Sequence, residues 1–223
     1  MNISYRLLII VSVFITSLIT ANIVAVKVIS LGPFTLPAAI FVFPVSYIFG
    51  DVLTEVYGYR TARTVIWLAF ACNLIFVFFA WVGQVLPAAD FWEAQGAYDR
   101  ILGFVPRIVG ASICGYLAGE FVNSYVLSKM KIMTNGRWLW SRTIGSTIIG
   151  QGLDTAIFIT LAYIGTGSPV AVMILHHWFM KTAIEIVFTP ATYAVVNRLK
   201  KSEGIDYYDI GTRYNPFAIY QKR

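Results

Sequence analysis

Two carboxylates stand four residues apart inside a stretch whose other residues are typical of a membrane-spanning helix. The stretch is 41–63, and the two acids are Asp51 and Glu55. On a helix, this spacing places both side chains on one face. A carboxylate at the depth of the bilayer costs at least about 2.5–3.5 kcal/mol on insertion scales. We therefore expect this face to meet a protein interior, a water-filled cavity or a ligand.

Other ionisable and amide side chains interrupt the later apolar stretches. They are Glu120, Asn123, Gln151, Asp154, His177, Lys181 and Glu185. His177, Lys181 and Glu185 follow one another at intervals of four residues, so a helix presents them as one stripe. Together with the first two acids, all seven are expected to line one shared substrate-binding cavity. Tyr47, one turn before the first acid, is expected to stack on a flat ligand.

A purely structural role is the alternative for each of these side chains. Lys181 could neutralise Asp154 or Glu185 as a tie between helices, and Glu55 could extend to the membrane interface. Five acids against one base would leave four acids uncompensated, which favours a ligand-binding cavity. The adjacent histidines 176–177 point to different helix faces, so no metal site is expected. The sequence predicts neither a catalytic residue nor a cofactor.

The composition is that of a helical membrane protein. Of the 223 residues, 58% are hydrophobic and 13% charged, whereas a soluble domain carries roughly 25% charge. Runs of about 20 apolar residues are long enough to cross a bilayer. We expect an all-α fold, a bundle of six transmembrane helices, with a transporter domain over 1–197 and a polar cytoplasmic tail over 198–223. The expected spans are 7–26, 37–57, 62–86, 106–128, 143–164 and 169–196.

Two local features refine this expectation. Pro44 falls inside the second expected span and should kink it, because proline removes a helical hydrogen bond. The longest connection, 87–107, has apolar residues at helical spacing. It predicts an amphipathic helix that lies on the membrane like a lid.

The basic residues predict the orientation in the inner membrane. Of the 17 lysines and arginines, 13 lie in the N-terminus, the second and fourth loops and the tail. These are Arg6, Arg60, Arg63, Lys129, Lys131, Arg137, Arg142, Arg198, Lys200, Lys201, Arg213, Lys222 and Arg223. Cytoplasmic loops carry such an excess, so both termini are expected in the cytoplasm, which requires an even number of spans. The net charge of +6 is therefore assigned to topology and not to nucleic-acid binding.

Carboxylates beside aromatic rings suit a guanine-like base. A carboxylate accepts two parallel hydrogen bonds from the ring N–H and the exocyclic amine, while an amide or lysine donates to the carbonyl. The same carboxylates would also suit a cationic amine or a proton relay. The residue types alone do not choose among these ligands.

Residues 43–63, FPVSYIFGDVLTEVYGYRTAR, resemble the signature of the queuosine-precursor transporters, a branch of the vitamin-uptake-type membrane proteins. The resemblance continues in RIVGASICGYLAGEFVNSYVLSKMK (107–131), LWSRTIGSTIIGQGLDTAIF (139–158) and EGIDYYDIGTRYNPF (203–217). It also includes Lys181, Glu185 and Pro190 in the last span. It therefore covers nearly the whole chain.

The resemblance implies a six-helix inner-membrane carrier that imports 7-cyano- or 7-aminomethyl-7-deazaguanine, precursors of the modified tRNA nucleoside queuosine. The implied partners are this small molecule and the lipid bilayer, with a homo-oligomer left open. The motif positions carried over as candidate site residues are Asp51, Glu55, Glu120, Asn123, Gln151, Asp154, Lys181 and Glu185.

Two other classes of protein compete with a carrier. An intramembrane aspartyl protease would use Gly50-Asp51 with Asp154, but Ile48 occupies the position of the first glycine in the G-x-G-D pattern. A substrate-binding membrane subunit would need a separate ATP-driven module. The chain has no phosphate-binding G-x-x-x-x-G-K-[ST] loop of its own. We therefore expect a carrier and no enzyme, with the subunit as the alternative.

Overall fold

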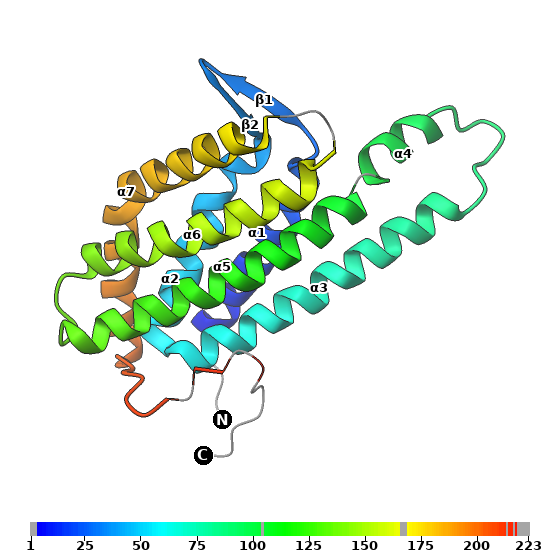
Figure 1. Ribbon diagram of the computed structural model, residues 1–223. Helices are drawn as coiled ribbons and strands as arrows, with labels where there is room; N and C mark the ends of the chain where they lie inside the picture. Colours follow the sequence, from blue (N-terminus) through cyan, green and yellow to red (C-terminus); the bar gives the residue numbers. More distant parts are fainter. Residues whose placement is uncertain (1–3, 104, 166–168, 213, 216, 218–223) are drawn as a thin grey trace.

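The computed structural model describes residues 4–103, 105–165, 169–212, 214–215 and 217. Its elements are α1 (Tyr5–Val24), β1 (Val28–Leu31), β2 (Phe34–Pro37), the 3-10 helix η1 (Ala38–Phe41), α2 (Phe43–Tyr57), α3 (Tyr59–Val85), α4 (Gln95–Leu102), α5 (Val105–Met133), α6 (Leu139–Tyr163) and α7 (Val170–Glu203). They form the helical bundle of Figure 1. The predicted all-α class is confirmed, with one small antiparallel hairpin, β1–β2, added between α1 and α2.

Five stretches among the described residues are long and apolar enough to cross a membrane. They contain α1, α3, α5, α6 and α7. The remaining expected span corresponds to α2, which has only 15 residues but buries 11 of them inside the bundle. This short helix is the element around which the longer helices pack.

The expected kink at Pro44 is wrong. The proline lies in the first turn of α2, because the chain forms a separate 3-10 helix before Val42 and starts the α-helix only at Phe43. A proline in the first turn interrupts no hydrogen bond, because the first N–H groups of a helix have no partner within it. Hence α2 enters the bundle unkinked.

Helices α5 and α6 approach each other closely through glycines. A Cβ atom on Gly119 would lie 2.7 Å from the carbonyl oxygen of Gly150, and one on Gly150 would lie 2.8 Å from that of Gly119. Any larger residue would force the helices apart, as at the small-residue interfaces of other membrane proteins. The polar side chains next to these glycines in α5 and α6 are thereby brought together.

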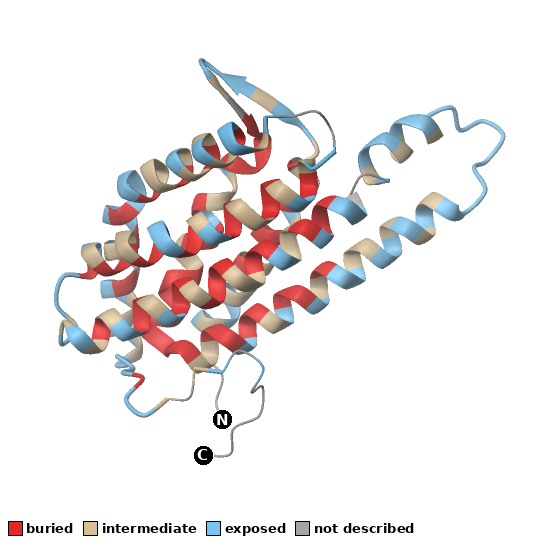
Figure 2. Cartoon of the chain, in the orientation of Figure 1, coloured by how far each residue is buried: buried red, intermediate tan, exposed pale blue. Residues whose placement is uncertain are grey.

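The amphipathic helix expected over 87–107 is present as α4, while its position on the membrane stays a prediction. Figure 2 shows α4 and the outer half of α3 as a largely exposed arm beside the bundle. None of the residues of α4 is buried, and the hydroxyl of Tyr98 donates to the carbonyl of Ala80 in α3 at 3.3 Å. The helix is therefore attached to α3 and does not cover the polar centre of the bundle.

Both ends of the described chain lie at one end of the bundle (Figure 1). The hydroxyl of Ser4 donates to Glu203 at 2.6 Å. Helix α7 continues past residue 197 to Glu203, and the chain then folds back under the α2–α3 turn. There Asp209 accepts hydrogen bonds from the backbone N–H of Tyr59 at 2.9 Å and from the hydroxyl of Ser128 at 2.7 Å. The C-terminal segment is thus part of the packed structure.

Candidate functional site

Nine of the ten predicted site residues form one buried cluster at the centre of the bundle. It is called the central polar cluster and consists of Tyr47 and Asp51 (α2), Glu120 and Asn123 (α5), Gln151 and Asp154 (α6), and His177, Lys181 and Glu185 (α7). Each of the nine is at most 5% exposed. The glycine contact of α5 with α6 and the central place of α2 bring these four helices together.

An ion pair between α6 and α7 lies inside this cluster. Lys181 Nζ is 2.7 Å from Asp154 Oδ2, and both side chains are buried. The same ammonium lies 3.9 Å from the ring centroid of Phe43, a distance typical of a cation–π contact. The predicted tie between Lys181 and Asp154 is therefore present, whereas no ion pair joins Lys181 to Glu185 among the described residues.

A second contact joins α2 to α5. The amide of Asn123 donates to Asp51 Oδ1 at 3.0 Å, while the other oxygen of that carboxylate is buried without a partner in the described structure. One turn further along α2, Thr54 shares a hydrogen bond of 3.0 Å with Ser124. These contacts fix the α2–α5 register and leave one carboxylate oxygen available.

Many polar atoms in this region are buried and have no hydrogen-bond partner in the described part of the chain. Within the cluster they include Tyr47 OH, Asp51 Oδ2, Gln151 Oε1, both ring nitrogens of His177, and Glu185 Oε1. Buried polar groups in folded proteins are nearly always paired, so such a concentration is typical of a binding site for a polar ligand. Four further hydroxyls, which were not predicted as part of the site, are buried and unpaired in the same way; they belong to Ser46, Tyr116, Thr147 and Thr155.

Two small cavities adjoin the cluster on either side of Phe43 and Tyr47, which line both. The first has a volume of about 20 Å³ and is also lined by Ser46, Tyr116 and Asp154. The second has about 10 Å³, and its polar lining is Gln151, Lys181 and Glu185 together with Tyr47. Each holds about one water molecule. A larger ligand therefore requires the helices to separate.

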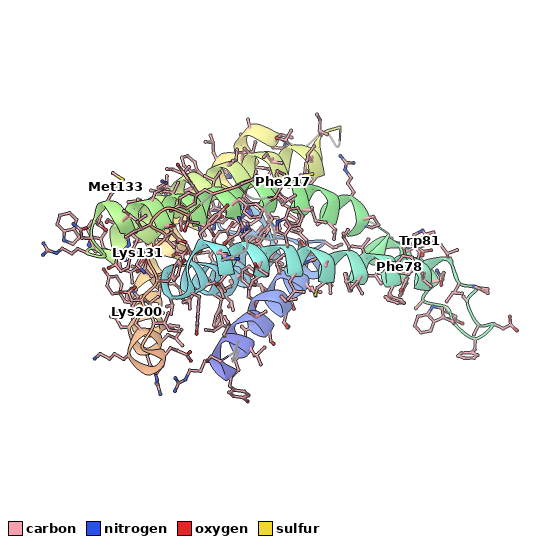
Figure 3. All side chains as sticks on the ribbon, turned by 90° about the horizontal axis from the view of Figure 1, so that it is seen from below. Phe78, Trp81, Lys131, Met133, Lys200 and Phe217 are labelled. Atoms are coloured by element: carbon pink, nitrogen blue, oxygen red, sulfur yellow. The ribbon has the colours of Figure 1, made fainter. Side chains whose placement is uncertain are left out.

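The remaining predicted site residue, Glu55, lies one turn further along α2 in a different environment. Its Oε1 atom is 2.7 Å from Arg142 Nη2, 2.8 Å from Lys200 Nζ and 3.6 Å from Lys131 Nζ. Lys131 and Lys200 also bind Asp206 of the C-terminal segment, at 2.6 and 3.0 Å. These five residues are called the Glu55 ion cluster, and Figure 3 shows Lys131 and Lys200 at the end of the bundle opposite Phe78 and Trp81.

The Glu55 ion cluster changes the interpretation of two basic residues. Lys131 and Arg142 were expected only as loop charges that set topology, yet each is at most 2% exposed. The spacing offered one signal, since Lys131 follows Asn123 by eight residues and therefore lies on the same face of α5. The structure thus separates Glu55 from the other nine site residues and surrounds it with cations.

Asp206 belongs to the part of this ion cluster outside the helices. Burial alone would raise the pKa of its carboxyl group, but hydrogen bonds from Lys131 and Lys200 outweigh this and hold the pKa below its ordinary value. The carboxylate is therefore ionised at neutral pH and ties the C-terminal segment to α5 and α7.

Long apolar helices around a buried polar centre define a multi-pass helical membrane protein. A family model described as "Putative vitamin uptake transporter" matches residues 37–195, and the chain belongs to this family. Its members are transporters, so the protein is a membrane transporter and not an enzyme. The aspartyl-protease alternative is thereby removed.

Two curated relatives are similar over most of the chain. A protein of Bacillus subtilis named "Probable queuosine precursor transporter" is 29% identical over 189 residues, which cover 83% of this chain and 82% of the relative. The "Queuosine precursor transporter" of Escherichia coli is 29% identical over 164 residues, which cover 70% of each. No solved structure matches the chain.

Proposed function

We propose that this protein is a carrier that imports queuosine precursors, 7-cyano- or 7-aminomethyl-7-deazaguanine, across the cell inner membrane. The observation that carries the proposal is the central polar cluster, whose unpaired carboxylate, amide and hydroxyl groups lie at the centre of a transporter-family bundle. The names of both relatives support the same cargo. The alternative is a substrate-binding subunit that needs a separate ATP-driven module.

The second cavity offers the groups that a guanine-like base requires. Glu185, with an unpaired buried oxygen, would accept hydrogen bonds from the ring N–H and the exocyclic amine. Lys181 or the amide of Gln151 would donate to the ring carbonyl. Tyr47 and Phe43 line the same cavity and supply aromatic faces for stacking. The four helices that carry the cluster would then close around the cargo from all sides.

The two expected cargoes differ in charge, and the cluster accommodates both. A cyano group is uncharged, whereas an aminomethyl group is an ammonium at neutral pH. Asp154 lines the first cavity while bound to Lys181, so its carboxylate would be shared between the lysine and a cationic cargo. We therefore place the 7-substituent toward the first cavity and the pyrimidine ring toward the second.

We also propose six crossings with both termini in the cytoplasm. The described ends lie at the same end of the bundle, which requires an even number of crossings, so α2 would be the sixth. Its 15 residues span roughly 22 Å, and the preceding η1 extends the path toward the opposite face. Ten of the thirteen basic residues used to predict orientation are described; Arg213, Lys222 and Arg223 lie outside the described residues.

Purified protein reconstituted alone in liposomes tests the function. We expect both 7-deazaguanine precursors to enter vesicles in the absence of ATP and of any other protein. Binding without entry would favour the substrate-binding subunit instead. If neither precursor binds or enters, the proposed function is wrong. Liposomes containing heat-unfolded protein provide the control for leakage.

A further inference from the structure

Among the acids of the central polar cluster, Glu120 is the one that neither lines a cavity nor binds another described residue. It is 2% exposed and lines neither cavity. Within the described part of the chain, no hydrogen bond or ion pair joins it to another residue. A carboxylic acid that is buried without a donor demands a separate explanation.

The carboxyl group of Glu120 lies against the backbone of α2. A Cβ atom on Gly50 would be 2.7 Å from Glu120 Oε1 and 3.6 Å from the ring of Phe14 in α1. The absence of a side chain at Gly50 leaves room for this approach, so the contact between α2 and α5 places the Glu120 carboxyl group close to the backbone of α2. Gly50 has no side chain that could donate a hydrogen bond to a negative charge on this carboxyl group.

The titratable groups that face Glu120 are acids and phenols. They are Tyr47 and Asp51 of α2, Tyr116 of α5, Asp154 of α6 and Glu185 of α7. Among the described residues of the cluster, Lys181 is the one lysine or arginine, and Asp154 already binds it at 2.7 Å. The buried imidazole of His177 neighbours Lys181 and makes no hydrogen bond in the described structure. Three acids are thus left without a cation, and close like charges in a buried site cannot all remain ionised.

Building on the function proposed above, we infer that Glu120 carries a proton through the import cycle, so that the protein is a proton–precursor symporter. The carboxylate takes one proton from water on the outer side, and the protonated form allows α2 to pack over it at Gly50. Release to the cytoplasm requires water to reach the group, which requires α2 and α5 to separate. One proton therefore accompanies each cargo molecule inward, and an uncharged cargo moves one positive charge.

Energy coupling follows from this geometry. A charged Glu120 without a partner opposes the α2–α5 contact, whereas a neutral Glu120 permits it. Protonation and helix packing are then two aspects of one equilibrium, and a proton gradient biases that equilibrium. At zero membrane potential, a gradient of one pH unit sustains at most about tenfold accumulation of an uncharged cargo for one proton per cycle.

The test uses the full chain in liposomes with 7-cyano-7-deazaguanine as the cargo and a pH difference of one unit, acidic outside, with valinomycin and equal potassium on both sides to hold the membrane potential at zero. We expect the wild-type protein to accumulate cargo several-fold above the outside concentration, and we expect addition of cargo to make the outside medium more alkaline. Glu120→Gln should lose both the accumulation of cargo and the cargo-dependent rise in the outside pH. Asp90→Asn, at an exposed acid between α3 and α4, is the matched control and should behave like the wild type.

The possible outcomes separate this inference from the proposed function. Wild-type protein that equilibrates the cargo without accumulation or proton uptake would overturn the symport while leaving the carrier intact. Accumulation by Glu120→Gln at the wild-type level would also overturn the role of this residue. If the wild-type protein takes up no cargo at all, the proposed function itself is wrong. If Glu120→Gln does not fold, the cargo-dependent pH change of the wild type still decides whether transport is coupled to protons.

Discussion

At the scale of single residues, Lys181 has two roles that the structure combines. It neutralises Asp154 at 2.7 Å, and it lines the cavity in which a base carbonyl would need a donor. The sequence offered these as alternatives, because spacing along α7 shows which residues share a stripe but not which residue of another helix faces it. The structural tie is confirmed, while donation to a cargo remains a prediction.

The two roles of Lys181 can be separated by a pair of substitutions. Lys181→Ala leaves a buried carboxylate unpaired and should destabilise the fold by about 3–5 kcal/mol. Adding Asp154→Asn removes the unpaired charge and should restore most of the thermal stability. If Lys181 also donates to the cargo, the stable double variant will still fail to transport. Thermal unfolding and precursor uptake should be measured on both singles and on the double; a stable and fully active double variant would reduce Lys181 to a structural tie.

At the scale of elements, the Glu55 ion cluster holds α2, α5, α6, α7 and the C-terminal segment at one end of the bundle. Glu55 is the centre of this arrangement, since Lys131, Arg142 and Lys200 all approach one of its oxygens. Its position explains why three of the basic residues predicted to set topology, Lys131, Arg142 and Lys200, are buried or half-buried. We therefore expect Glu55 to act in packing and closure rather than in binding the base.

Comparison of Glu55→Gln with Asp206→Asn tests this assignment. The first change leaves buried cations without their carboxylate and should lower stability by about 3–5 kcal/mol. The side chain of Asp206 is 43% exposed, so its removal should cost less than about 1 kcal/mol. Because the pKa of Asp206 is depressed, its contribution is present at neutral pH and is lost only as the pH falls below about 3.9. A Glu55→Gln variant with an unchanged melting temperature but no precursor binding would instead show that Glu55 binds the substrate.

At the scale of the whole molecule, the sequence predicted the helical class, the polar centre and the positions of most helices. Intramembrane Asp51, Asp154 and Lys181 were detectable because a charge in an apolar run is rare and must face inward. The separation of Glu55 from the other nine site residues could not be predicted. It depends on the rotation of α2 and on the fold-back of the C-terminal segment, and both follow from contacts between distant parts of the chain. The close approach of Gly119 to Gly150 could not be predicted either, because glycine spacing alone does not identify the partner helix.

The proposed function depends on binding of the guanine-like cargo by the central polar cluster. The most direct measurement is the dissociation constant of 7-cyano-7-deazaguanine for purified wild-type protein, for Glu185→Gln and for the control Asp90→Asn. Loss of a charge-assisted pair of hydrogen bonds should weaken binding at least about tenfold, which corresponds to ~1.4 kcal/mol, while the control stays at the wild-type value. Folded Glu185→Gln protein that binds the precursor as tightly as the wild type would show that this carboxylate does not bind the cargo.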